Sequence, residues 1–296
     1  MKQVIMLARL ICLILVIHTF SIKVAADDVK PRYTIYDREA SYYNNSLNNL
    51  SYPVKLLLLT LEVGKTKFGD YDTKILTTPY PKTRVIHFVK SQNNAIIWST
   101  TAKKLEEELS AVYVPIIKGI LGYRVFLIRS EEQARFDSIT KLAELRQFTI
   151  GQGKAWNDNA ILRHNGFTVI GAEANGLVNM LLAKRFDIYS RGIHEPWIEL
   201  KAGIKMSIEN NLMLNYPLPI YFFVNSANKD LHQRLTWGLE HIIKTGQFDQ
   251  LFKNHPIYSE AMNKINFHKR KSFTLINPNL SPQTKALLKK DKYWLK

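Results

Sequence analysis

The sequence predicts an α/β protein of two lobes, each an open, mostly parallel sheet flanked by helices. Two observations predict this class. Residues 149–195 show in order strand, glycine-containing turn, helix, strand, helix and strand, which is the βαβαβ rhythm of an open parallel sheet. Two strongly β-prone runs, Gly122–Arg129 and Pro219–Val224, lie on either side of this region and would carry the chain into a second lobe and back.

The second lobe is predicted from the order of its apolar runs. After the turn we expect a helix over residues 160–166, a strand over Phe167–Ile170, a helix over Leu177–Lys184 and a strand over Arg185–Arg191. Ligands of parallel sheets lie at the carboxyl ends of the strands. The loops after these strands are therefore where a site is expected.

The first lobe shows the same alternation. Tyr52–Val63 is rich in leucine, with Pro53 near its start and Gly64 just after its end, the asymmetry typical of a helix. The other expected elements are strands over Arg32–Tyr36, Tyr71–Thr77, Ala95–Trp98 and Val112–Val114, and helices over Lys82–Lys90 and Lys103–Leu109.

After the return to the first lobe comes the best-defined helix of the chain. Asn228 is the expected N-cap and Gly246 the residue just past the last turn. An apolar stripe at helical spacing predicts packing on the first lobe. Its members are Leu231, Leu235, Leu239 and Ile242.

Residues 1–26 are typical of an export signal. Two basic residues precede the apolar core Leu10–Ile17, which is too short for a membrane span, and Val24–Ala26 is a small-residue cleavage site. We expect cleavage after Ala26 and a periplasmic location; a retained anchor is the alternative. Cys12 is the only cysteine, so the processed chain would have no disulfide.

The chain is basic, and its charge gathers at the C-terminus. Loss of Lys2, Arg9 and Lys23 with the signal lowers the net charge from +16 to +13. Residues 264–296 hold nine Lys or Arg against Asp291 alone, a net +8. Basic tails can bind nucleic acid or anionic surfaces. These basic residues share no helical face with interleaved aromatics, so we expect a solvated tail and no nucleic-acid binding.

Two crossings around an inserted lobe predict a hinged protein with a cleft between the lobes. The predicted segments are a signal peptide 1–26, the first part of lobe one 27–122, a hinge strand 123–128, lobe two 129–218, a hinge strand 219–224, the return of lobe one 225–262 and a basic C-terminal tail 263–296.

Several motifs, in this order and spacing, resemble those of a known family. Over roughly residues 30–255 the chain resembles the amino-acid-type periplasmic solute-binding proteins (solute-binding protein family 3), which have the type II periplasmic-binding fold. The motifs are Ser99–Lys104 followed by Tyr113–Pro115, similar to a Thr-x-x-Arg segment and the Pro-Tyr patch after it; Ile150–Gly153 at the start of the second lobe; Arg185–Asp187, similar to a Gly-Arg-x-Asp strand entry; and Asp230–Phe252, similar to the terminal helix, glycine and aromatic ending.

The chain departs from the family at three places. The family arginine of Thr-x-x-Arg holds a ligand carboxylate through a planar fork, whereas Lys104 is a point charge. Lys154–Trp156 replaces a small hydroxyl residue, and Arg191–Gly192 replaces an acid that meets an α-amino group. The resemblance therefore implies a differently shaped anion or a solute unlike an amino acid, or a degenerate cleft.

Cleft sites combine aromatic walls with a few polar groups. Among the aromatic candidates, Trp156 is expected to be exposed in a helix-start loop, and Arg191 and Glu195 follow a strand where ligands are met. The predicted ligand-binding residues are Trp98, Thr100, Lys104, Trp156, Asn157, Arg191 and Glu195.

The candidates also have structural interpretations. Lys104 can be one more solvated charge on a Lys/Glu helix, Trp98 a core residue and Asn157 an N-cap. Arg191 and Glu195 can form a mutual ion pair. The sequence leaves these alternatives open.

Enzyme signatures are mostly absent. There is no Gly-x-Ser-x-Gly elbow, no phosphate loop of the Walker type and no Cys/His spacing for a metal. Glu173 and Glu195 are the candidates for an acid/base pair in a cleft, although nothing in their spacing favours that role. We therefore predict no enzymatic activity and no cofactor.

These observations predict an exported, monomeric binding protein that captures a small polar or anionic solute, amino-acid-like or an organic acid, by hinge closure. Its use would be ABC-type transport or sensing, with a separate transporter permease or membrane receptor as partner. The first alternative is an interaction protein with a vestigial cleft, whose basic tail docks on an anionic surface. The second is a cleft hydrolase or dehydratase.

Overall fold

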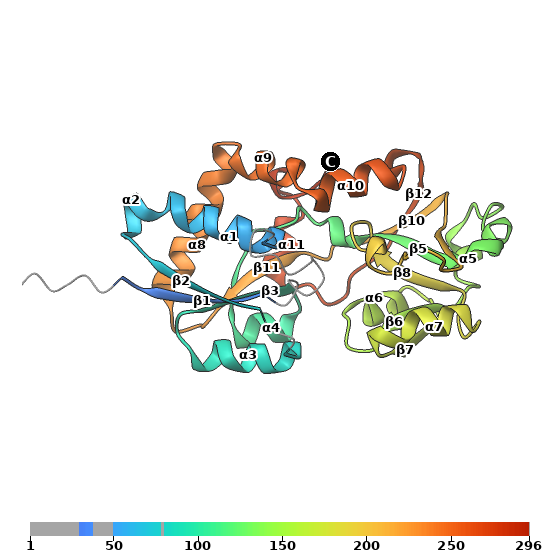
Figure 1. Ribbon diagram of the computed structural model, residues 1–296, viewed down its shortest axis with the longest axis horizontal. Coiled ribbons are helices and arrows are strands. Elements are labelled where there is room, and N and C mark those ends of the chain that lie inside the picture. Colours follow the sequence, from blue (N-terminus) through green and yellow to red (C-terminus); the bar gives the residue numbers. More distant parts are fainter. Residues whose placement is uncertain (1–29, 38–49, 78–79, 296) are drawn as a thin grey trace, which may run out of the picture. The chain divides into compact units, whose positions relative to one another are not determined.

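A computed structural model describes residues 30–37, 50–77 and 80–295 of the chain (Figure 1). The predicted signal peptide and its cleavage site lie outside these residues. Pro31–Lys296 form one compact unit. Within the described ranges, no helix has the length and apolar character that crossing a membrane requires.

The first sheet has the strand order β2-β1-β3-β11-β4. β1 lies parallel to β2 and β3, whereas β11 is antiparallel to β3 and β4. Its strands are β1 (Arg32–Asp37), β2 (Asp72–Thr77), β3 (Ala95–Thr100), β4 (Ser110–Val112) and β11 (Ile220–Val224).

The second sheet repeats this plan, with the order β12-β10-β5-β8-β6-β7 and β9 paired to β5. β6 is parallel to β7 and β8, and β5 is antiparallel to β8 and β10. Its strands are β5 (Tyr123–Arg129), β6 (Ile150–Gly153), β7 (Val169–Ala172), β8 (Ile188–Gly192), β9 (Met206–Ile208), β10 (Leu212–Asn215) and β12 (Lys271–Thr274). The predicted α/β class with two sheets is confirmed, but the sheets are mixed rather than mostly parallel, because β11 in the first sheet and β5 in the second pair antiparallel with their neighbours.

The two runs predicted as hinge strands are regular members of the sheets. β5 pairs within the second sheet and β11 within the first, so each lobe receives one antiparallel strand after the chain has crossed. The chain passes between the sheets just before them, in residues 113–122 and 216–219, which we call the first and second crossing segments.

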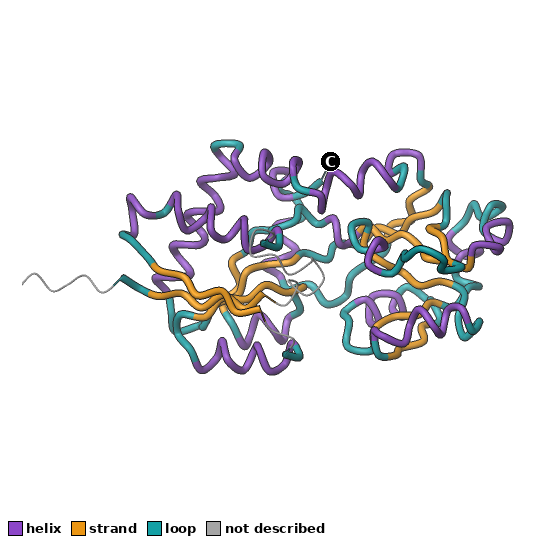
Figure 2. The backbone as a smooth tube through the Cα atoms, in the orientation of Figure 1, coloured by secondary structure: helices purple, strands orange, loops and turns teal. Residues whose placement is uncertain are grey.

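Helices surround both groups of strands (Figure 2). α1 and α3 lie on opposite sides of the first sheet (Figure 1), and α7 contacts β5, β6 and β8 of the second. The helices are α1 (Tyr52–Val63), α2 (Lys65–Phe68), α3 (Lys82–Ser91), α4 (Lys103–Glu108), α5 (Leu142–Leu145), α6 (Asp158–His164), α7 (Leu177–Leu182), α8 (Lys229–Lys244), α9 (Gln247–Asn254), α10 (Pro256–Lys264) and α11 (Pro282–Leu287).

The predicted helix after the return is α8, and its caps are confirmed. The Asn228 side chain accepts a hydrogen bond from the Leu231 amide, and Gly246 has φ +79°, which glycine adopts without strain. The predicted apolar stripe is buried and α8 packs on α1. Gly238 makes this close approach possible, because a Cβ there would lie 2.4 Å from the Thr60 carbonyl oxygen.

The prediction of a solvated C-terminal tail is wrong. β12 pairs with β10 of the second sheet, and the chain then returns to the first lobe, where α11 packs. The basic side chains of this segment are mostly exposed, while single apolar residues between them are buried. That spacing is too irregular to give a helical or strand pattern in the sequence. The buried anchors are Leu275, Leu280, Leu287 and Tyr293.

Candidate functional site

Buried charged side chains gather at the carboxyl end of β8. Arg124, on the neighbouring strand β5, is 1% exposed. Its Nη1 lies 3.5 Å from Asp158 Oδ1 and 3.7 Å from Glu195 Oε2. The Tyr216 hydroxyl donates a 2.6 Å hydrogen bond to the same Asp158 oxygen. The charge of Arg124 is therefore balanced by two carboxylates, one of which, that of Asp158, lies at the start of α6.

Arg191 forms a second centre beside the first. Its Nη1 lies 3.5 Å from Glu195 Oε2 and its Nε 3.0 Å from Glu199 Oε1. The guanidinium lies 5.0 Å from the ring centre of Trp156 and 5.4 Å from that of Tyr189. Since Glu195 Oε2 also accepts a 2.7 Å bond from the Gly192 amide, this one carboxylate joins both arginines at the strand end.

The arginines decide the charge of the carboxylates. Burial disfavours the ionised form of Glu195, but Arg191 and Arg124 outweigh burial and lower its pKa to about 2. The pKa of Glu199 is raised, because burial and the charge of Glu195 outweigh the attraction of Arg191. Burial lowers the pKa of His194 to about 4. At neutral pH Glu195 is therefore ionised and His194 neutral.

This region holds buried polar atoms that have no hydrogen-bond partner among the described residues. Both donors and acceptors are present, and Arg191 Nε belongs to the set because its contact with Glu199 lacks hydrogen-bond geometry. A buried polar atom without a partner costs about 1–3 kcal/mol, so such atoms normally meet water or a ligand. They are Arg124 Nε, Gln152 Oε1, Ser190 Oγ, Arg191 Nε, His194 Nδ1, Trp197 Nε1 and Glu199 Oε2.

Asn157 connects this region to the first sheet. It occupies the N-cap position of α6, but its side chain makes no capping bond. Its Nδ2 instead donates to Thr100 Oγ1 at 3.2 Å and to the Thr101 carbonyl at 3.0 Å, at the end of β3. The carboxyl ends of strands from both sheets therefore meet at this contact.

The structure brings the predicted residues together in two groups. Thr100 and Asn157 contact each other, and Arg191 contacts both Trp156 and Glu195. The predicted Arg191–Glu195 ion pair is present. Trp156 is half-buried rather than exposed, because its ring packs on the Arg191 guanidinium and stacks with Tyr189.

The remaining two candidates lie in the first lobe, on β3 and α4. Trp98 is 7% exposed and meets Phe222 edge-on, as in the core interpretation. Lys104 is exposed in the first turn of α4, and its side chain forms no hydrogen bond or ion pair with a described residue. A ligand-binding role for these two residues and for the other five stays a prediction.

Most of the buried network was not predicted from the sequence. Arg124 was treated as part of a β-prone run, although a charge between apolar neighbours in a buried strand is itself a signal. Asp158, Tyr216 and Glu199 are polar residues in helix-start or loop segments, where nothing local marks them. The pairing of β5 with β10 brings Arg124 beside Tyr216, and its pairing with β8 brings Arg124 beside Glu195.

The geometry does not favour the enzyme alternative. Glu173 is exposed and lies 2.5 Å from Lys154 Nζ, also exposed. Glu195, with its pKa lowered to about 2, is a poor general acid or base at neutral pH.

The cluster predicts a pH dependence of stability. The unfolded chain protonates His194 near its ordinary pKa of 6.5, whereas the folded chain does so only near 4. The unfolded state therefore binds more protons between these values, and stability falls as the pH falls. We expect a loss of about 1 kcal/mol between pH 7 and 5.5, measured by urea unfolding, since one pKa unit corresponds to about 1.4 kcal/mol.

The variant His194→Asn should reduce this slope. His255, whose pKa burial also lowers to about 4, contributes a separate part, so His194→Asn/His255→Asn should be flatter still. An unchanged slope in the double variant would contradict this assignment.

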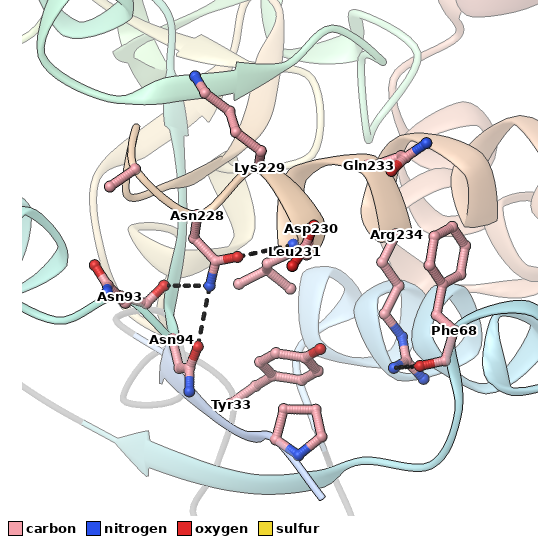
Figure 3. A pocket seen from close by; sticks show the side chains of 12 residues that line it. Tyr33, Phe68, Asn93, Asn94, Asn228, Lys229, Asp230, Leu231, Gln233 and Arg234 are labelled. Carbon is pink, nitrogen blue, oxygen red and sulfur yellow. Dashed lines mark hydrogen bonds between the residues drawn. The ribbon is translucent and has the colours of Figure 1, made fainter.

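Surface cavities also occur away from this cluster. The largest of the four described, about 670 Å³, lies at the start of α8 (Figure 3). Its amides bond to one another, since Asn228 Nδ2 donates to the Asn93 carbonyl and to Asn94 Oδ1. None of the seven predicted ligand-binding residues lines any of these four cavities.

No family model and no curated protein matches the sequence. Solved structures do match. The probable amino-acid ABC transporter extracellular-binding protein YtmK of Bacillus subtilis has a TM-score of 0.57 at 14% identity, over 76% of this chain and 97% of that one. An arginine-specific periplasmic binding protein of Salmonella typhimurium gives 0.51 at 12%, over 79% and 99%. A histidine kinase sensor domain similar to periplasmic binding proteins gives 0.53 at 14%, over 75% and 93%. With the strand order of both sheets, these similarities show that the chain has the fold of the amino-acid-type periplasmic binding proteins.

Proposed function

We propose that this protein is an exported solute-binding protein that captures a small polar or anionic solute between its two lobes. The observation that carries the proposal is the set of unpartnered polar atoms at the ends of β6 and β8, next to the contact of Asn157 with the end of β3. Their mixture of donors and acceptors suits a solute that offers both, such as an organic acid or an amino-acid-like molecule.

The expected contacts come from both lobes. Lys104 and Thr100 would act from the first lobe, Trp156, Asn157 and Arg191 from the second. An exposed ammonium such as that of Lys104 is available for an anionic group, whereas Arg191 is already paired with Glu195 and Glu199. The anionic group of the solute is therefore assigned to Lys104.

The first test is thermal unfolding of residues 27–296 with a panel of amino acids, organic acids, short peptides, polyamines and sugars. A ligand at about 100 times its dissociation constant stabilises the native state by roughly 2.7 kcal/mol. The variant Lys104→Ala should weaken binding about tenfold, the effect of losing about 1.4 kcal/mol from one charge-assisted hydrogen bond.

Lys253→Ala is the matched control, because Lys253 is an exposed lysine near the end of α9. It should leave both the midpoint and the ligand-induced shift unchanged. A panel in which no compound shifts the midpoint of the folded protein would contradict the proposal. A shift that survives in Lys104→Ala would remove only the assignment of Lys104.

Export to the periplasm and delivery to a membrane partner belong to the same proposal. Residues 1–26 supply the signal pattern, and the similar structures include an ABC transporter binding protein and a kinase sensor domain. Both uses require a separate membrane protein, a transporter permease or a receptor. Co-purification from membranes, with and without a solute that shifts the midpoint in the unfolding test, distinguishes the two uses. A permease as partner indicates transport, and a receptor indicates sensing.

A second candidate is an interaction protein with a vestigial cleft. The internal pairing of Arg191 with Glu195 and Glu199 favours it, because these charges satisfy one another without a solute. On this alternative, charge reversal at exposed Lys285 and Lys289 should abolish binding to an anionic surface while Lys104→Ala has no effect.

A further inference from the structure

The C-terminal segment is held firmly on the second lobe. Next to β12, Arg270 donates hydrogen bonds from Nη1 to the carbonyls of Glu209 and Leu212 and lies 3.6 Å from Glu209 Oε2. After β12, Asn165 forms two hydrogen bonds with the backbone of Ile276, at 2.7 and 3.0 Å. The chain is therefore fixed to the second lobe up to residue 276.

The same segment is held on the first lobe a few residues later. The Ser281 side chain caps α11 by accepting a bond from the Thr284 amide at 3.0 Å. Thr284 Oγ1 donates to Glu106 Oε1 of α4 and accepts from the Tyr221 hydroxyl of β11, both at 3.1 Å. Glu106 also accepts a hydrogen bond from the Thr101 hydroxyl. The backbone carbonyl of Thr101 is in turn the acceptor for the Asn157 side chain.

Beyond α11 the chain is anchored on α8. Tyr293 is 4% exposed and its hydroxyl donates to Glu240, which also pairs with Lys292. Only residues 277–280 lie between the contacts with the second lobe and the cap of α11.

The segment also holds both crossing segments. Asn277 Nδ2 donates to the Pro217 carbonyl at 2.8 Å, in the second crossing segment. The Trp294 ring packs on Gly119 of the first crossing segment so closely that a Cβ there would lie 2.7 Å from it. Next to it, the Leu295 amide donates to the Lys118 carbonyl at 2.9 Å.

The first crossing segment bends sharply at this contact. Lys118 has φ +48° and Gly119 φ +75°, so two successive residues are left-handed, and a side chain beyond glycine is strained there. Hinges are a few residues whose φ and ψ absorb a change in domain angle. Because Trp294 and Leu295 contact this bend, the φ and ψ angles of Lys118 and Gly119 cannot change freely.

We propose that residues 275–295 form a strap that restrains separation of the two lobes by holding both crossing segments. Separation requires Lys118, Gly119 and Pro217 to change conformation, and each is bonded to or packed against the strap. The strap acts with or without a solute, so its test is independent of the proposed function. Through Glu106 it also supports the first-lobe residues that meet Asn157.

The strap is tested by measuring the distance between the lobes with a pair of spin labels. Cys12 is the only native cysteine, so labels can be placed at two exposed positions, Lys74→Cys and Ser138→Cys, in a full chain carrying Cys12→Ser. Without added solute, the chain with an intact strap should give one narrow distribution of distances. Trp294→Ala should broaden it and shift it to longer distances.

Trp237→Ala is the matched control, because Trp237 is also half-buried and lies on α8, where its ring meets those of Phe68 in α2 and His241 in α8. It should lower stability without moving the distance distribution. If Trp294→Ala does not fold, Asn277→Ala, which removes the bond to the Pro217 carbonyl and a local bond from the Asn279 amide, should still broaden the distribution. Unchanged distances in a folded Trp294→Ala or Asn277→Ala chain would overturn the proposal.

Discussion

Replacing Arg124 by leucine is expected to lower the free energy of unfolding by about 3–5 kcal/mol, the usual loss when one partner of a buried charge network is removed. Arg124 is the group that lies between Asp158 and Glu195, and its backbone acceptors include the Ser190 carbonyl. Without it, the buried Asp158 carboxylate keeps, among the side chains that the structure describes, the Tyr216 hydroxyl as its hydrogen-bond donor. Urea unfolding at pH 7 measures the loss.

Arg135→Leu is the control for this variant. Arg135 also pairs with two carboxylates, those of Glu132 and Asp187, but its side chain is 45% exposed. Exposed pairs contribute about 0–1 kcal/mol, so the loss should be several times smaller than for Arg124→Leu. Equal losses would show that burial of Arg124 does not determine the effect.

The pH dependence of this stability loss distinguishes an effect of the charge network from an effect of packing. In the parent chain Arg191 and Arg124 lower the pKa of Glu195 to about 2, whereas the Arg124→Leu chain keeps only Arg191 of these two, so the parent loses more stability on acidification. The difference in stability between the parent chain and the variant should therefore shrink as the pH falls below about 4, where unperturbed carboxyl groups titrate.

Helices whose local signals agree could be predicted closely from the sequence. The prediction for Tyr52–Val63 matches α1, and that for α8 is right in its cap, its stripe and its end. In these segments propensity, capping residues and apolar period favour the same structure. The strand β4 is less well predicted, because the expected Val112–Val114 is displaced from the observed Ser110–Val112.

Candidate residues could be predicted only where the family motif lies near a strand end. Arg191 and Glu195 follow β8 directly, and their mutual pairing was among the alternatives. Arg124 could not be placed with them, because its position opposite Gly192 depends on the register between β5 and β8. Register is set by tertiary packing and turn geometry, which local composition does not contain.

The C-terminal segment shows a different limit of the sequence. Its lysines dominate its composition, yet Leu275, Leu287 and Tyr293 provide its buried contacts at spacings that follow the shape of the underlying lobes. A segment that crosses from one lobe to the other needs no period of its own. The lack of a helical face shared by its basic and aromatic residues therefore predicted solvation for a segment that is held at both ends.

Gly238→Ala is expected to destabilise the protein by about 3 kcal/mol, although alanine is the better helix former by about 1 kcal/mol. A Cβ at this position of α8 would lie 2.4 Å from the carbonyl oxygen of Thr60 and 2.8 Å from its Cγ2. The carbonyl belongs to the backbone of α1 and cannot rotate away, so one helix must shift, and overpacking of this kind costs about 1–3 kcal/mol or more.

Gly176→Ala shows which effect decides the sign. Gly176 has φ −95° and lies just before α7, and a Cβ there meets nothing within 4 Å. Its replacement should be neutral or stabilise by up to about 1 kcal/mol, because alanine reduces the entropy of the unfolded chain. If urea unfolding instead gives the same change for both variants, propensity outweighs packing, and the contact of α8 with α1 is looser than the 2.4 Å approach requires.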